Sequence, residues 1–219
     1  MIEIIIDEWK ALLIGGFISS MEILAGSLLG LAFGNLFALI AYSLPKVRAL
    51  ILTIVSIFAP IPVVFYLPFS ISLFGFGIVQ VTLLVALLST LLFVTAAYTA
   101  FTALPRAMLD IANVYRLSSF DKFRMVLLPY AIPSLGVAFR IALAFSWVVA
   151  YIGEVKSSDG RNGLGAMTKA YVDLTNYDYA YVCAAAIAFF AIILDQLSSF
   201  TFAYFSRWQP IERGAANEV

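Results

Sequence analysis

The basic residues of this chain gather in one short segment, where they could make charge-assisted contacts with a partner. The segment Asp110 to Pro129 reads DIANVYRLSSFDKFRMVLLP, and long apolar stretches flank it. It contains Arg116, Lys122 and Arg124 and follows Arg106, in a protein of which only 12% is charged. The chain has no G-x-x-x-x-G-K-[ST] phosphate loop. The chemistry that this segment offers is therefore recognition, and we predict no catalytic residue.

Residue types that bind metals or form covalent bonds are scarce. The chain has no histidine and a single cysteine, Cys183, which lies in an apolar run. An intrachain disulfide is impossible, and we expect no transition-metal site and no cofactor bound by this chain. The net charge of zero argues against a nucleic-acid partner.

The composition indicates a membrane protein. The chain is 63% hydrophobic with a mean hydropathy of +1.00, and apolar runs of a length that crosses a hydrocarbon core of about 30 Å recur along it. These runs are apolar all round rather than striped, which argues against a soluble helical bundle. We predict an all-α polytopic membrane protein with five spans. They are about Ile23–Leu44, Ala49–Leu67, Ile78–Ala103, Ala131–Ile152 and Tyr179–Ser206.

Lysine and arginine counts predict the orientation. One set of connections, with the C-terminal tail, carries eight of these residues, and the opposite side carries four. The larger set is expected to be cytoplasmic. We therefore predict a single domain over residues 1–219, with an external N-terminal segment (1–22), a cytoplasmic loop between the third and fourth spans (104–129), an external loop (153–178) and a cytoplasmic tail (207–219).

Two features near the N-terminus bear on this topology. The segment lacks the basic start of a signal peptide, so we take it as mature sequence. An apolar stretch, Ala11–Ser20, precedes the first span and either extends its helix or lies at the interface. Glu22 is expected to be an interfacial carboxylate in water. The external loop is expected to be irregular because it is rich in Gly, Ser, Asn and Asp.

The cytoplasmic loop is predicted to form two short amphipathic helices. The first follows Pro105 and runs to Tyr115, and the second is capped by Ser118 or Ser119 and interrupted at Pro129. A solvated connection is one interpretation of this loop. The other is a protruding knob whose apolar stripes fill a groove on a partner.

The spacing of the loop resembles the EAA loop in permease subunits of ATP-binding-cassette (ABC) importers. Further resemblance, to the nitrate/sulfonate/taurine branch, covers about Ser19 to Trp208. It is carried by PIPVVFYLPFSISLFGFG, FRIALAFSWVVAYIGEV, NGLGAM, Leu194-Asp195 and Arg207-Trp208. The residues at the EAA offsets are Asp110, Ile111, Ala112, Arg116, Val126, Leu128 and Pro129.

Two of these positions depart from the family pattern. Asp110 stands where the family has Glu, and keeps the charge. Arg116 stands where the family has Gly at a tight turn, and glycine permits backbone angles that arginine resists. Either the turn differs here, or Arg116 adds a contact to the partner.

The resemblance implies a coupling loop that docks on a cytoplasmic ATPase subunit. ATP and Mg²⁺ would then be bound by that subunit, and this chain would not be an enzyme. Two permease copies, a homodimer by expectation, and an external solute-binding protein would complete an importer in a prokaryotic inner membrane. It would move a small anionic or zwitterionic solute of nitrate, sulfonate or taurine type by alternating access. The residues expected to contact the ATPase are Arg106, Asp110, Ala112, Tyr115, Arg116, Leu117 and Phe120.

A self-contained secondary transporter or channel is the alternative function. It would use charges inside the membrane, and Arg140 and Asp195 both lie about 15 Å deep. We predict that these two residues pair between the fourth and fifth spans as a structural lock. The other interpretation is that Arg140 faces the pathway and attracts an anion.

Small residues and prolines inside the spans complete the prediction. Gly26, Gly30 and Gly34 share one helix face and are expected to pack closely on another span. Prolines break the second span and free carbonyl groups, which favours a position beside a water-filled cavity or a kink that only shapes packing. The residues predicted to line the pathway are Pro60, Pro62, Pro68, Ser70 and Ser146.

Overall fold

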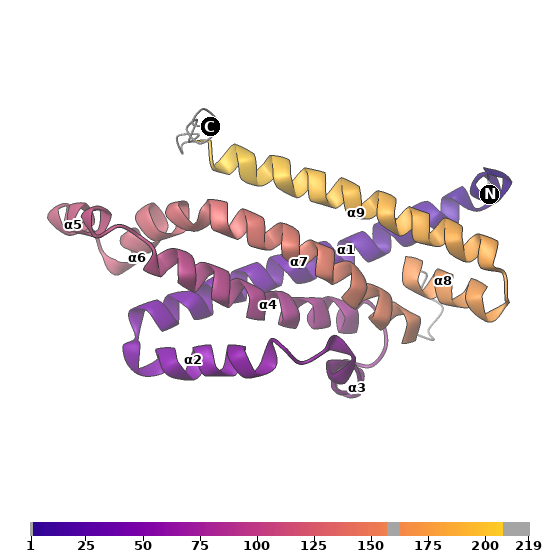
Figure 1. The fold of residues 1–219 in the computed structure, drawn as a ribbon, viewed down its shortest axis with the longest axis horizontal. Helices are drawn as coiled ribbons and strands as arrows, with labels where there is room; N and C mark the ends of the chain where they lie inside the picture. The colour runs from indigo at the N-terminus through magenta and orange to yellow at the C-terminus, as the bar shows by residue number, and fades with distance from the viewer. Residues whose placement is uncertain (1, 157–162, 208–219) are drawn as a thin grey trace, which may run out of the picture.

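The structure is a computed structural model that describes residues 2–156 and 163–207, and within these residues all regular secondary structure is helical. Long helices lie along one common direction, with α5 and α6 at one end of the bundle and α8 at the other (Figure 1). The predicted tail lies mostly outside the described residues, as does part of the external loop. The helices are α1 (Ile2–Ser43), α2 (Pro45–Phe58), α3 (Val63–Phe74), α4 (Ile78–Thr102), α5 (Arg106–Val114), α6 (Ser119–Lys122), the π-helix η1 (Phe123–Leu127), α7 (Leu128–Lys156), α8 (Leu164–Asp173) and α9 (Tyr177–Phe205).

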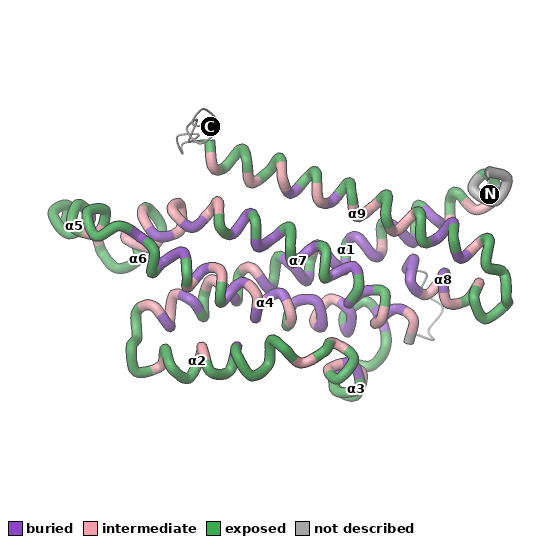
Figure 2. Tube along the Cα trace, in the orientation of Figure 1, coloured by how far each residue is buried: buried purple, intermediate pink, exposed green. Residues whose placement is uncertain are grey.

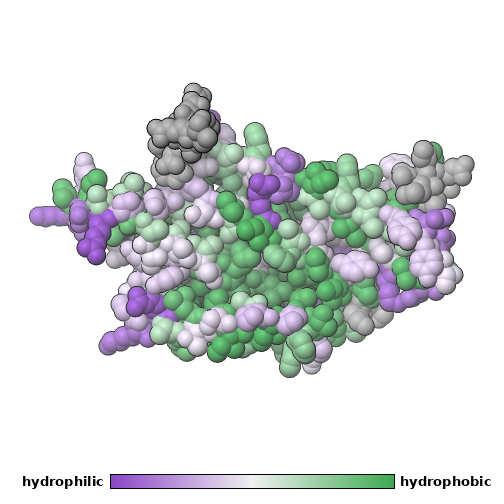
Figure 3. Space-filling view, viewed as in Figure 1, coloured by the Kyte–Doolittle hydropathy of each residue, from purple (hydrophilic) through white to green (hydrophobic). Residues whose placement is uncertain are grey.

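Four helical stretches of the described chain are long and apolar enough to cross a membrane, and the bent pair α2–α3 would make a fifth. The third and fifth predicted spans agree with α4 and α9 to within two residues. The apolar stretch Ala11–Ser20 extends the helix of the first span and is not a separate interfacial segment. Helix α1 is one helix of 42 residues that includes this stretch. Hydrophilic side chains gather at both ends of the molecule and apolar ones cover its flank, as a bilayer requires (Figure 3).

The predicted second span is broken into two helices, as its prolines indicated. Helices α2 and α3 meet at 104° across the break after Phe58. Pro60 lies in that break and Pro62 caps α3, whereas Pro68 lies inside α3 without ending it. Two prolines two residues apart remove two backbone N–H donors from the same turn, which a continuous helix cannot replace.

The loop between α4 and α7 begins as predicted and then departs from the prediction. The Ser118 hydroxyl accepts a hydrogen bond from the Asp121 backbone N–H at 3.2 Å, which confirms the predicted cap. Pro129 does not interrupt the second helix, because α6, η1 and α7 follow one another without a break. The N–H of Leu128 bonds to the carbonyl of Phe123, five residues earlier. The backbone hydrogen bonds thus span five residues instead of four in the turn just before Pro129, which has no backbone N–H to donate.

The external loop was predicted to be irregular, and this is wrong for part of it. Helix α8 starts directly after Gly163. Its sequence, LGAMTKAYVD, has only one glycine beyond the start, and Met167 and Thr168 are buried against the bundle. Tertiary packing of one face thus stabilises a helix in a segment whose composition favours loops.

The core lies where α1, α4 and α7 meet, and burial is concentrated in these helices (Figure 2). Gly26, Gly30 and Gly34 of α1 all face α4. A Cβ atom at Gly26 would lie 2.6 Å from the Thr82 carbonyl oxygen, and one at Gly30 would lie 2.4 Å from the Ser89 Cβ. The absence of side chains at these positions therefore allows the two backbones to approach closely.

Candidate functional site

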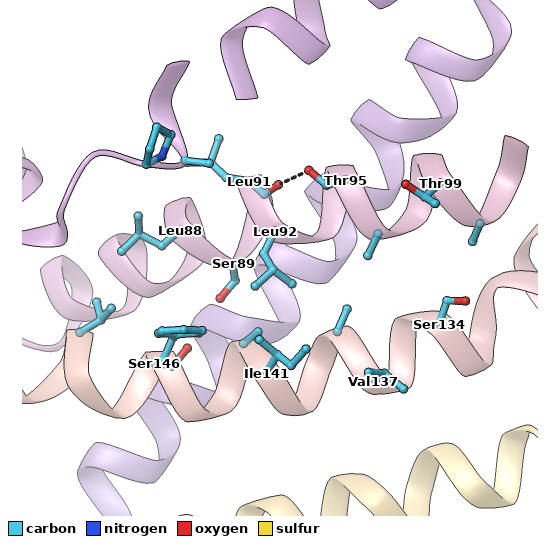
Figure 4. A pocket seen from close by; sticks show the side chains of 18 of the residues that line it. Leu88, Ser89, Leu91, Leu92, Thr95, Thr99, Ser134, Val137, Ile141 and Ser146 are labelled. Atoms are coloured by element: carbon cyan, nitrogen blue, oxygen red, sulfur yellow. Dashed lines mark hydrogen bonds between the residues drawn. The ribbon is translucent and has the colours of Figure 1, made fainter. Parts of the chain in front are cut away.

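A cavity of about 1070 Å³ lies between the α2–α3 break, α4 and α7. Figure 4 shows α4 and α7 as two opposing walls, with Leu88, Leu92 and Thr99 on one and Val137 and Ile141 on the other. The 104° bend between α2 and α3 borders the cavity, and the wall residues of α4 and α7 include several small side chains.

The lining of this cavity carries hydroxyl groups and no charged side chain. Some hydroxyls are already engaged: Tyr130 donates to the Ala103 carbonyl oxygen at 3.2 Å, and Thr95 donates to the Leu91 carbonyl oxygen at 3.4 Å. Ser134 and Thr99 also line the cavity. An apolar cavity with a few hydroxyl groups can hold a small solute by weak, replaceable hydrogen bonds.

Three of the five predicted lining residues border this cavity: Pro60, Pro62 and Ser146. Pro68 and Ser70 do not. Ser70 is buried, donates to the Leu67 carbonyl oxygen at 2.9 Å and accepts from the Gln80 amide at 2.8 Å, so it joins α3 to α4.

The sequence analysis missed the hydroxyls on the other walls. Those of α4 could have been found from their spacing, because Thr95 and Thr99 are one helical turn apart and follow Leu88 and Leu92 on the same face. Ser134 gives no comparable signal, because its role depends on how α7 faces α4.

Arg140 and Asp195 form a bidentate ion pair between α7 and α9. The Arg140 Nε and Nη2 atoms donate to the two Asp195 carboxylate oxygens, each at 2.8 Å. The side chains are 48% and 34% exposed, and neither residue lines the cavity. The structure thus brings together the two residues that the sequence analysis paired, and it places them away from the α4 wall.

A second surface lies beyond the C-terminal end of α4, on α5 and α6. Its apolar side chains are unusually exposed: Ile111 is 58% exposed, Val114 80%, Tyr115 75% and Phe120 68%. Ile111 and Val114 were not among the predicted contact residues, although positions 111, 114 and 115 form an i, i+3, i+4 stripe that could have revealed them. We refer to these four residues as the α5–α6 surface.

The other predicted contact residues divide between this surface and the core. Arg106, Asp110 and Arg116 are exposed and Leu117 is half-buried. Ala112 is only 1% exposed. Ala112 therefore packs inward, and a direct contact with a partner is not available to it.

Arg116 forms the turn between α5 and α6 with a left-handed backbone, at φ 51°. The Leu117 N–H bonds to the Ala112 carbonyl and the Arg116 N–H to the Asn113 carbonyl, at 3.1 and 2.9 Å. This pair of bonds is a Schellman motif, in which glycine is the usual residue at the position of Arg116. The turn is therefore the one that glycine would make, built with a strained arginine.

The comparison with family models identifies the chain. Residues 26–209 match the model described as "Binding-protein-dependent transport system inner membrane component". The chain belongs to this family. The cavity and the α5–α6 surface are thus features of an inner membrane component of a binding-protein-dependent transport system.

Curated relatives agree with this assignment. A probable ABC transporter permease protein of Haemophilus influenzae is 31% identical over 65% of this chain and 59% of its own length. The riboflavin transport system permease protein RibX of Chloroflexus aurantiacus is 29% identical over 68% and 55%, and the taurine transport system permease protein TauC of Escherichia coli is 25% identical over 69% and 54%. The chain therefore spans a little over half the length of these relatives.

Solved structures show the same fold. A chain of the MetNI methionine ABC transporter, in inward-facing conformations, superposes with a TM-score of 0.72 at 18% identity, over 92% of this chain and 97% of that one. A chain of an amino acid ABC transporter gives a TM-score of 0.69 at 17% identity, over 94% and 97%. The fold is that of ABC importer permeases, and the protein is a multi-pass membrane protein of the inner membrane.

Proposed function

We propose that this permease forms half of the translocation pathway of an ABC importer. A second copy would face the cavity and complete the pathway, and the α5–α6 surface would dock on a cytoplasmic ATPase subunit that binds ATP and Mg²⁺. An external solute-binding protein would deliver the solute. This arrangement requires the α5–α6 end and the C-terminus to be cytoplasmic and the α8 end to be external, in agreement with the lysine and arginine counts.

The proposed solute is small and anionic or zwitterionic, of nitrate, sulfonate or taurine type. Support comes from the relatives TauC and the putative aliphatic sulfonates permease SsuC, the latter 27% identical over 105 residues. The cavity is compatible with such a solute, because hydroxyl groups can donate hydrogen bonds to oxyanion oxygens and no lining carboxylate would repel them. The relative RibX makes riboflavin the competing solute to test.

The observation that carries the proposal is the α5–α6 surface, where apolar side chains are exposed at the end of the bundle that carries charged residues. Val114, at 80% exposure, has no packing role within the chain. Val114→Asp would put a charge into the docked interface, and we expect the ATPase subunit to be lost on purification and uptake to fall at least about tenfold.

The experiment compares uptake of taurine and of riboflavin by vesicles that contain the permease, the ATPase and the binding protein. Val172→Asp on α8, where Val172 is 39% exposed, is the matched control and should leave ATPase binding unchanged. ATP-independent uptake by the permease alone would support the alternative, a secondary transporter, and would refute the proposal.

A further inference from the structure

A buried polar cluster lies at the α8 end of the bundle, away from the cavity. Glu154 of α7 accepts a hydrogen bond from the Ser19 hydroxyl of α1 and one from the Gly165 backbone N–H of α8, both at 2.6 Å. Ser19 in turn accepts from the Leu164 N–H at 3.0 Å. One carboxyl group thus joins α1 to the consecutive helices α7 and α8.

The packing around Glu154 is close. A Cβ atom at Gly163 would lie 2.3 Å from its carboxyl carbon, and one at Gly165 would lie 2.9 Å from Oε2. The two glycines therefore let the start of α8 approach the carboxyl group directly. We call the contacts of Ser19, Glu154, Leu164 and Gly165 the α8 latch.

A second carboxyl group lies against the first. Glu22 lies on α1 one helical turn after Ser19, whose hydroxyl bonds to Glu154, and the two glutamates are only 3% and 4% exposed. The expectation that Glu22 lies in water is therefore wrong. The reason is that α8 covers the α1–α7 junction, a contact that the sequence of α1 does not reveal.

Polar atoms without partners surround this pair of carboxyl groups. Glu22 Oε2, the Ser20 hydroxyl and the Trp147 indole N–H are buried and make no hydrogen bond to any group in the described part of the chain. Trp147 is 8% exposed and lines a small void with Ser19 and Glu154. Among the side chains that the structure describes, the ion pairs are Arg140–Asp195 and Lys169–Asp173, and neither glutamate belongs to one of them.

We propose that Glu22 and Glu154 form a proton-binding site, in which one proton shared by the two carboxyl groups holds the α8 latch closed. Two ionised carboxylates held close together in a buried site repel strongly, whereas an acid–carboxylate pair makes a short, charge-assisted hydrogen bond. Binding converts the pair from a charge of −2 to −1. Release of the proton to water leaves two negative charges that push α1 away from α7 and loosen α8.

The groups that face the pair come from four helices. Helix α1 contributes Ser19 and Ser20, α7 contributes Trp147, and α8 contributes two backbone N–H groups. Ile187 of α9 lines the adjacent void. Among the described residues, the carboxyl groups are thus the titrating members of the cluster. This inference does not depend on the solute or on docking of the ATPase.

Infrared spectroscopy tests the proton directly on the unmodified chain, reconstituted in lipid vesicles with its ATPase. At neutral pH we expect a carbonyl-stretch band of a protonated, buried carboxylic acid. Glu22→Gln should remove it, and Asp173→Asn, which removes an exposed carboxylate from α8, should leave it unchanged. Absence of the band in the parent, including the case in which a sodium ion holds two carboxylates together, would overturn the proposal.

Spin labels test the latch. We would attach them at Leu13→Cys on α1 and Leu174→Cys after α8, which are 49% and 72% exposed, in a Cys183→Ser background. The distance distribution should broaden as the pH rises in the parent and in Asp173→Asn. It should stay narrow in Glu22→Gln, whose amide can donate to Glu154 at any pH. The same pH response in Glu22→Gln as in the parent would contradict the inference, and the infrared result decides if that variant does not fold.

Discussion

The two faces of α4 meet their neighbours in opposite ways. Towards α1, three glycines bring the backbones so close that a single methyl group would not fit without displacement. Towards α7 and the α2–α3 break, the same helix borders a cavity of about 1070 Å³. The comparison indicates that α1 and α4 form one rigid unit, whereas the spacing between α4 and α7 leaves room for a solute.

The largest effect is expected from a methyl group on the tight face. Gly26→Ala would place a Cβ atom 2.6 Å from the Thr82 carbonyl oxygen, a backbone atom that cannot rotate away. We expect a loss of about 1–3 kcal/mol in stability, measured as a lower thermal unfolding temperature in detergent. Ser134→Thr, which adds a methyl group on the cavity side, is the control and should unfold at the parent temperature. Equal unfolding temperatures for both variants would remove the distinction between the two faces.

A smaller effect is expected from α7, which also has two unlike faces. One lines the cavity and the other holds Arg140 against Asp195. Asp195→Asn leaves the Arg140 guanidinium without its bidentate partner inside the membrane, so the unfolding temperature should fall. Arg140→Gln combined with Asp195→Asn should recover part of the loss. If the double variant is less stable than the single one, the pair is not a structural lock.

The smallest effect is expected at the turn between α5 and α6, which touches neither face of α4. Arg116→Gly would relieve a left-handed backbone that costs about 1–2 kcal/mol in a non-glycine residue. Slower hydrogen exchange at the Leu117 amide, with an unchanged unfolding temperature of the bundle, is the expected result. Arg106→Gly is the control, because Arg106 lies at a helical position. It should not slow hydrogen exchange at the Leu117 amide. Faster exchange in Arg116→Gly would show that the arginine side chain stabilises the turn.

Most of the helices could be predicted from the sequence, because an apolar run of membrane length has few other structures available. Helices α4 and α9 illustrate this, since nothing in either run breaks the pattern. Pro60 and Pro62 marked where the second span breaks, but not the angle of 104°, which depends on packing of α3 against α4. The π-helix was not predictable, because its sequence, FRMVL, also suits an α-helix.

The candidate site was predicted only in part, for a related reason. Residues that share one face of a single helix can be identified from their spacing in the sequence, as for the apolar stripe of α5. Contacts between distant helices are visible only where the residue type itself requires a partner, as for Arg140 and Asp195 inside the membrane. The environments of Glu22, Ser134 and the start of α8 depend on which helix packs against them. No local sequence pattern predicts that packing.

The π-helix η1 has a further consequence for how the α5–α6 surface is aligned with the cavity. Because each residue of an α-helix turns the chain by about 100°, the additional residue in this turn sets the rotational register between the two regions. A deletion of one residue there would still give an unbroken helix of similar length. It would, however, turn the α5–α6 surface toward a different side of the molecule, so the alignment of this surface with the cavity depends on the number of residues as well as on their types.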